Sequence, residues 1–183
     1  NNGGPALVQG NTGAATVLNR DGGQIMANGS GTGLNAVALS SGGTVTNTGQ
    51  ALNGAASEIF SADGTAVAID GGAGVVTNSA GARIQSNGSS AVMMFAGGTV
   101  TNDGASQIIA NPAWTTGVAI TGGAGTMSNT NGALIKGGDT GVFVSQGGTV
   151  INGANSTIEG ANQSVESVGP TTLENAGLLR GNV

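Results

Sequence analysis

One motif recurs along this chain and constrains its fold more than any other feature. Residues 97–108 read GGTVTNDGASQI, with a close copy from Gly42 (GGTVTNTGQ) and another from Gly147 (GGTVINGANSTI). A motif that returns at a spacing of this order is the signature of a solenoid, in which each repeat is one unit stacked on the next. Because 183 residues favour one domain, we expect residues 1–183 to form a single repeat domain.

Each repeat divides into three short segments, which we call a, b and c. The a segment carries an apolar residue and, two positions later, Asn: Val17/Asn19, Val45/Asn47, Val76/Asn78, Val100/Asn102, Met127/Asn129, Val150/Asn152 and Leu173/Asn175. The b segment centres on Ile25, Ile59, Ile84, Ile108, Ile135, Ile158 and Leu179. The c segment carries an apolar pair: Val37/Leu39, Val67/Ile69, Val92/Met94, Val118/Ile120 and Val142/Val144, weakening to Val165/Ser167.

Alternation of period two within each segment indicates strands, and glycine interrupts every window that could form a helix. A turn of about 24 residues with three constant strands explains the spacings, with residues 28–35 and 50–57 as insertions in loops. The sequence therefore predicts an all-β fold, a parallel β-helix (β-solenoid) with three strands per rung and about seven rungs. Residues 6–10 (ALVQG) resemble residues 133–137 (ALIKG), so we expect them to form the b strand of a leading rung.

The residue types at the corners of each turn follow from the backbone conformations that a corner needs. Gly-Gly pairs at 42–43, 71–72, 97–98, 122–123 and 147–148 fall between c and a, where glycine permits positive φ. Asn ends each a strand and tolerates the left-handed region, so we expect it to turn the chain there. The same side chains, stacked from rung to rung, predict a structural ladder: Asn19, Asn47, Asn78, Asn102, Asn129, Asn152 and Asn175.

Composition removes several classes of function. Charged residues make up 7% of the chain, and nine acids against four bases give a net charge of −5. Phosphate-backbone binding needs clustered Lys and Arg, so we expect no nucleic-acid partner. Cysteine and histidine are both absent, which rules out disulfides and thiolate or imidazole metal sites, and we expect no cofactor. No apolar run approaches the roughly 20 residues of a membrane helix, so we expect no transmembrane segment in this piece.

The run GGTVTNxG followed by an Ile-centred strand resembles the passenger regions of Gram-negative autotransporters (type V secretion), over about residues 16–183. Filamentous-haemagglutinin-like adhesins are the near alternative. The resemblance implies a right-handed parallel β-helix that is secreted through the outer membrane and displayed on the bacterial cell surface. A translocator barrel and a signal peptide, which belong to the family, do not appear here, so we interpret the chain as a fragment of a longer passenger.

The acidic residues do not predict a catalytic site. They are scattered, and we expect Glu159 to form a surface ion pair with Lys136 of the rung below, and Lys136 to neighbour Gln107. We therefore expect no enzyme, although a polysaccharide-active β-helix enzyme stays an alternative.

Hydroxyl side chains that should point outward form a second pattern, which resembles an ice-binding face. Leu18, Ile151 and Glu174 interrupt it. Its members are Thr44/Thr46, Thr77, Thr99/Thr101, Thr126/Ser128 and Thr149.

Exposed apolar residues form the third pattern. We predict that the following side chains point outward and either bind a partner or are covered by local loop packing: Phe60, Met93, Phe95, Ile109, Trp114 and Phe143. The function we expect is a structural and adhesive module, a rigid rod whose loops and faces meet host-cell, matrix or same-protein surfaces. Because the strand edges at both ends are unpaired, end-to-end or lateral self-association into a filament is an alternative.

Overall fold

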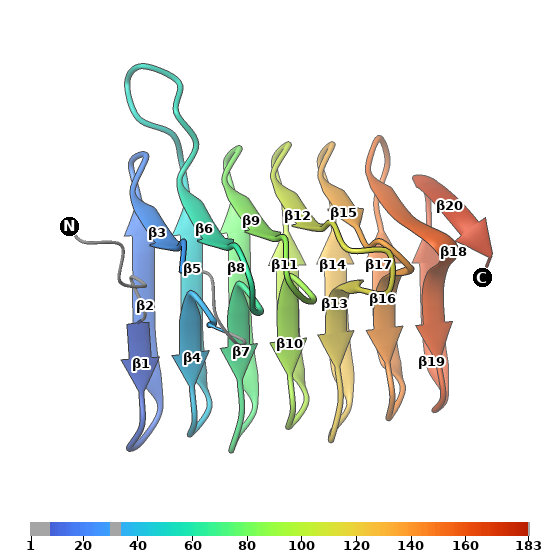
Figure 1. The fold of residues 1–183 in the computed structure, drawn as a ribbon. Coiled ribbons are helices and arrows are strands. Elements are labelled where there is room, and N and C mark those ends of the chain that lie inside the picture. The colour runs from blue at the N-terminus through green and yellow to red at the C-terminus, as the bar shows by residue number, and fades with distance from the viewer. Residues whose placement is uncertain (1–7, 30–33, 183) are drawn as a thin grey trace.

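The computed structural model describes residues 8–29 and 34–182, which form strands and turns and contain no helix. Seven turns of chain lie side by side in sequence order, with each turn contacting the turns before and after it (Figure 1). Every pairing between named strands is parallel. The prediction of an all-β parallel solenoid with three strands per rung and about seven rungs is therefore confirmed.

The a strands form one sheet of seven strands. In spatial order they are β2 (Ala15–Arg20), β5 (Gly43–Thr48), β8 (Gly74–Ser79), β11 (Gly98–Asn102), β14 (Gly125–Asn129), β17 (Gly148–Asn152) and β19 (Thr171–Asn175). Val100 lies opposite Met127, which lies opposite Val150, and all three side chains are fully buried. The register expected from the repeat spacing is confirmed for this sheet.

The b and c strands form a second sheet, joined through the long strand β18 (Thr157–Ser167). The b ladder holds β3 (Gln24–Ala27), β6 (Glu58–Ser61), β9 (Arg83–Ser86), β12 (Gln107–Ala110), β15 (Leu134–Lys136), the start of β18, and β20 (Leu178–Asn182). The c ladder holds β1 (Val8–Gly10), β4 (Val37–Leu39), β7 (Val67–Ile69), β10 (Val92–Met94), β13 (Thr116–Ile120), β16 (Thr140–Val144) and the end of β18.

The inward residues of the three ladders form one continuous apolar core. Inside a representative turn, Val100, Ile108 and Val118 are fully buried, and small residues such as Ala110 fill the space beside the large ones. Burial of one such side chain contributes about 1.5–3 kcal/mol, which makes the core the main driving force for folding. Because each turn packs only on its neighbours, stability is close to a sum over turns.

The turn from c to a depends on glycine, as the sequence predicts. The first glycine of each pair has φ between +68° and +76°, and Gly98 has φ +134°. A Cβ atom at Gly98 would lie 2.2 Å from the carbonyl oxygen of Gly74, which is its partner in the neighbouring turn. Glycine therefore serves two purposes here, because it adopts the backbone angle and lets successive turns approach closely.

Two expectations about local structure are wrong. The ladder Asn residues are not the left-handed residues, because positive φ falls two or three positions later, at Asp21, Ala80, Ala105, Asn131 and Asn155. The ladder Asn must stay in the strand so that its side chain points inward.

Residues Val8–Gly10 pair with β4 and therefore start the c ladder rather than the b ladder, while residues 6 and 7 lie outside the described range. The step of nine residues from Val8 to Val17 matches the other c-to-a steps, and that spacing overrides the local likeness.

The described residues of both insertions lie outside the named strands. The loop between β5 and β6 projects beyond the other turns (Figure 1) and closes on itself through an antiparallel bridge between Gln50 and Ala56. The 28–35 insertion lies between β3 and β4, and its residues 30–33 are outside the described range. Loops accept such insertions because they lie outside the packed ladders.

Candidate functional site

An Asn column runs through the interior beside the apolar core. Every Asn of the ladder except the last donates from Nδ2 to Oδ1 of the Asn in the next turn, at 2.8–2.9 Å. Each of these Nδ2 groups also lies within hydrogen-bond distance of backbone carbonyls, so that Asn102 reaches Ser106 and Leu134. Buried amides normally cost about 1–3 kcal/mol when unpaired, and this column satisfies them. All the side chains of the column are buried except that of Asn175, which ends it and is exposed. The role of the column is therefore to hold the register between turns.

Three charged side chains, those of Lys136, Glu159 and Arg180, form a cluster on the outer face of the b ladder. Lys136 Nζ lies 2.7 Å from Glu159 Oε1, and Arg180 Nη1 lies 3.3 Å from Glu159 Oε2. The hydrogen bond from Lys136 lowers the pKa of Glu159 most strongly; partial burial opposes this, and the charges of Lys136 and Arg180 lower the pKa further. The ion pair expected between Glu159 and Lys136 is confirmed.

The expectation that Lys136 neighbours Gln107 is wrong. The register places Ile109 beside Lys136 and pairs Gln107 with Leu134. The reason is that Ile108 lies opposite Ile135 in the b ladder, so the next residue of each strand also pairs, and Ile109 meets Lys136. Over residues 8–29 and 34–182, no three of His, Cys, Asp or Glu gather closely enough to hold a metal ion.

The outer face of the a sheet presents two regular columns of small polar side chains. Hydroxyls occupy most positions, and apolar or charged residues replace them at Leu18, Val75, Ile151 and Glu174. One column holds Thr16, Thr44, Val75, Thr99, Thr126, Thr149 and Thr172, and the other holds Leu18, Thr46, Thr77, Thr101, Ser128, Ile151 and Glu174. Adjacent strands lie about 4.8 Å apart, so each column repeats at that spacing.

The six apolar residues predicted to face outward lie in four separate places. Phe60 and Ile109 flank Gln85 on the outer face of the b ladder. Met93 and Phe143 flank Ala119 on the outer face of the c ladder. These four side chains are half-buried. Because one pair lies on the b ladder and the other on the c ladder, the four do not form one patch.

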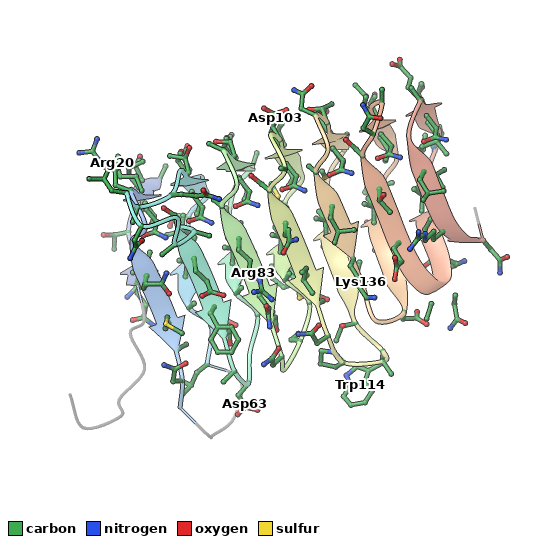
Figure 2. All side chains as sticks on the ribbon, turned by 90° about the horizontal axis from the view of Figure 1, so that it is seen from above. Arg20, Asp63, Arg83, Asp103, Trp114 and Lys136 are labelled. Atoms are coloured by element: carbon green, nitrogen blue, oxygen red, sulfur yellow. The ribbon has the colours of Figure 1, made fainter. Side chains whose placement is uncertain are left out.

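The other two of the six are the most exposed. Phe95 follows β10 at the turn from c to a and is 44% exposed, whereas Trp114 lies in the loop between β12 and β13 and is 78% exposed. Figure 2 shows Trp114 and Asp63 at the same edge of the molecule, where the b–c loops stack, and Asp103 at the opposite edge.

A hollow of about 600 Å³, open to solvent, lies beside Trp114. The b–c loops of three successive turns line it, through Asp63, Asn87, Gly88, Asn111, Pro112 and Trp114. Trp114 is among the residues predicted from the sequence to face outward, whereas Asn87 and Asn111 were not predicted to take part in a site. A usable signal was present, because each of these Asn residues directly follows the small inward residue that ends a b strand, at Ser86 and Ala110.

A second hollow of about 520 Å³ lies under the inserted loop between β5 and β6. It is lined by Asp21, Gln50, Ala51, Leu52 and Asn53, and Leu52 is fully exposed. This hollow contains no aromatic side chain and rests on the loop that extends farthest from the packed turns.

Comparison with protein-family models, with curated proteins and with solved structures found no match for this chain. In the described part of the chain there is no helix with the length and apolar character needed to cross a membrane.

Proposed function

We propose that this chain is a structural and adhesive module, a stiff rod that presents its loops and side faces to other surfaces. The observation that carries the proposal is the unbroken stack of seven turns, with one continuous apolar core and a hydrogen-bonded Asn column inside it. Such a stack resists bending because neighbouring turns share both hydrophobic contacts and backbone hydrogen bonds. Its variable elements, the b–c loops and the inserted loop, all lie outside that stack.

The resemblance to autotransporter passengers supports a location on the bacterial surface. A surface rod must remain folded outside the cell without disulfides, and the chain contains no cysteine. The partners we propose are host cells, extracellular matrix or a second copy of the same protein. Low charge supports contacts made by neutral polar groups rather than by steering between charged surfaces.

An adhesion assay with the purified domain tests this proposal. Beads coated with the wild-type domain should adhere to epithelial cells, to matrix-coated plates or to one another, and beads coated with the unfolded Ile135→Asp variant should not. Equal adhesion of the two proteins on all three targets would refute the proposal. Protease treatment of intact bacteria that express the parent gene tests the location, because a surface rod should be cleaved while a cytoplasmic protein is protected.

Ice binding is a second candidate function, and the two hydroxyl columns of the a sheet favour it. A flat sheet with hydroxyls repeated in two directions can order water in a lattice. Thermal hysteresis measurement tests this candidate. Thr101→Lys, at the centre of the array, should abolish ice binding, while Gln107→Lys on the b face should leave it unchanged. Absence of thermal hysteresis in the wild-type protein would remove the candidate.

A further inference from the structure

We propose that the hollow beside Trp114 binds a neutral saccharide, with a pyranose ring stacked on the indole and its hydroxyls hydrogen-bonded to Asn87 and Asn111. This inference rests on the adhesive function proposed above and gives that function a ligand class. Three features of the hollow support it: an exposed aromatic side chain on a supported loop, a pair of amides held by hydrogen bonds, and the charge of the walls.

The first feature is the supported loop that carries Trp114. Within its loop, Thr115 donates from Oγ1 to the carbonyl of Pro112 at 2.6 Å and from its backbone N–H to the same oxygen at 3.1 Å. The next turn supports the loop from below, since Gly138 approaches Pro112 so closely that a Cβ would lie 1.8 Å from the Pro112 carbonyl. A large indole thus faces solvent on a supported loop. Its flat apolar surface suits the C–H face of a sugar ring, and its N–H remains a donor.

The second feature is the amide pair. Asn87 Oδ1 accepts hydrogen bonds from Asn111 Nδ2 at 2.6 Å and from Gln85 Nε2 at 2.9 Å. These contacts orient both amides and leave Asn87 Nδ2 as a donor and Asn111 Oδ1 as an acceptor, without protein partners within the described residues. A sugar hydroxyl both donates and accepts, so it matches this pair. Because the amides are already held in place, a ligand loses less free energy in ordering them.

The third feature is the charge of the walls. Among the described residues that line the hollow, Asp63 is the only ionisable one, and none is Lys or Arg. A carboxylate disfavours phosphate and acidic sugars and leaves neutral hydroxyls as suitable ligands. The volume of about 600 Å³ falls within the range of small-molecule sites, and the open shape suits the end or side of a chain of sugars. The hollow under Leu52 has no comparable aromatic surface.

Fluorescence provides a direct test, because Trp114 is the only tryptophan and the chain has no tyrosine. We expect titration with cellohexaose, chitohexaose, laminarihexaose or maltohexaose to shift the emission of Trp114 to shorter wavelength and to saturate in the millimolar range for at least one of them. Sialyllactose serves as the acidic comparison and should bind more weakly. The change Asn111→Leu should weaken the binding of the responding hexasaccharide roughly tenfold.

Calorimetry extends the test to variants without the fluorophore. Trp114→Ala should lose all measurable binding of that hexasaccharide, and Leu52→Ala, at the other exposed loop, should bind as the wild type does. Thermal melting controls for folding, since Trp114 is exposed and its replacement should leave the melting temperature within a few degrees of the wild type.

The inference is overturned if none of the four hexasaccharides changes the emission, if sialyllactose binds more tightly than they do, or if Asn111→Leu binds as the wild type does. Bead adhesion separates this inference from the proposed function. If Trp114→Ala abolishes hexasaccharide binding but its beads adhere as strongly as wild-type beads, the saccharide site is not the adhesive site, so the inferred ligand class of adhesion is wrong while the adhesive role stands. If the hexasaccharide binds but wild-type beads do not adhere, the adhesive role is wrong while the saccharide site stands.

Discussion

Replacing Asn102 by Ala tests whether the Asn column holds the turns together. The Asn102 side chain accepts a hydrogen bond from Asn78 and donates to Asn129 at 2.9 Å, to Leu134 at 2.9 Å and to Ser106 at 3.3 Å. An amide has two N–H hydrogens, so three hydrogen bonds are lost, and the fully buried Oδ1 of Asn129 loses its side-chain donor. At about 0.5–1.5 kcal/mol for each bond and about 1–3 kcal/mol for the stranded acceptor, the free energy of unfolding should fall by roughly 3–5 kcal/mol.

The matched control is Asn175→Ala, at the exposed end of the same column. Asn175 accepts from Asn152, and its own replacement leaves Asn152 with backbone acceptors, so we expect a loss of about 1 kcal/mol or less. Thermal and urea unfolding, followed by far-UV circular dichroism, measure both variants. For a chain of this length the central variant should melt roughly 6–20 °C below the wild type. Equal destabilisation by the two replacements would refute the view that the buried column carries this stability.

Three further predictions concern the core, the corners and the surface. Ile135→Asp should abolish cooperative unfolding, because it places a carboxylate among fully buried side chains, and a near-normal melting curve would contradict the register of the b ladder. Gly98→Ala should destabilise by roughly 2–4 kcal/mol, whereas Gly132→Ala, where nothing lies within 4 Å, should cost about 1 kcal/mol; urea unfolding compares them. Glu159→Gln should cost at most about 1 kcal/mol at neutral pH; because the folded pKa is lowered, the loss should vanish as pH falls through that pKa, and a pH series of melting temperatures checks this.

The placement of β1 shows where local sequence reasoning fails. Residues 6–10 look like a b strand, yet Val8–Gly10 pairs with β4. Short alternating strands carry the same pattern in all three ladders, so composition alone does not separate them. The spacing to the following a strand does separate them, because the length of each corner is set by the geometry of the turn.

The candidate binding hollow shows a second limit. Trp114 stood out in the sequence because large aromatic residues are rare in this chain. Asn87 and Asn111 did not stand out, since Asn is frequent and their separation of 24 residues has meaning only when successive turns are stacked. The b–c loops differ in length from turn to turn, so no fixed period predicts which of their residues meet.

The amino-acid sequence by itself determined the period of the coil, the three ladders, the glycine corners and the Asn column. Each of these follows from local rules that are repeated in every turn, and repetition makes a weak local signal strong. Only the tertiary structure decided that positive φ falls after the ladder Asn, and that Asn87, Asn111 and Trp114 share one hollow. These features depend on the alignment between turns of unequal loop length, which is settled when the whole stack has formed.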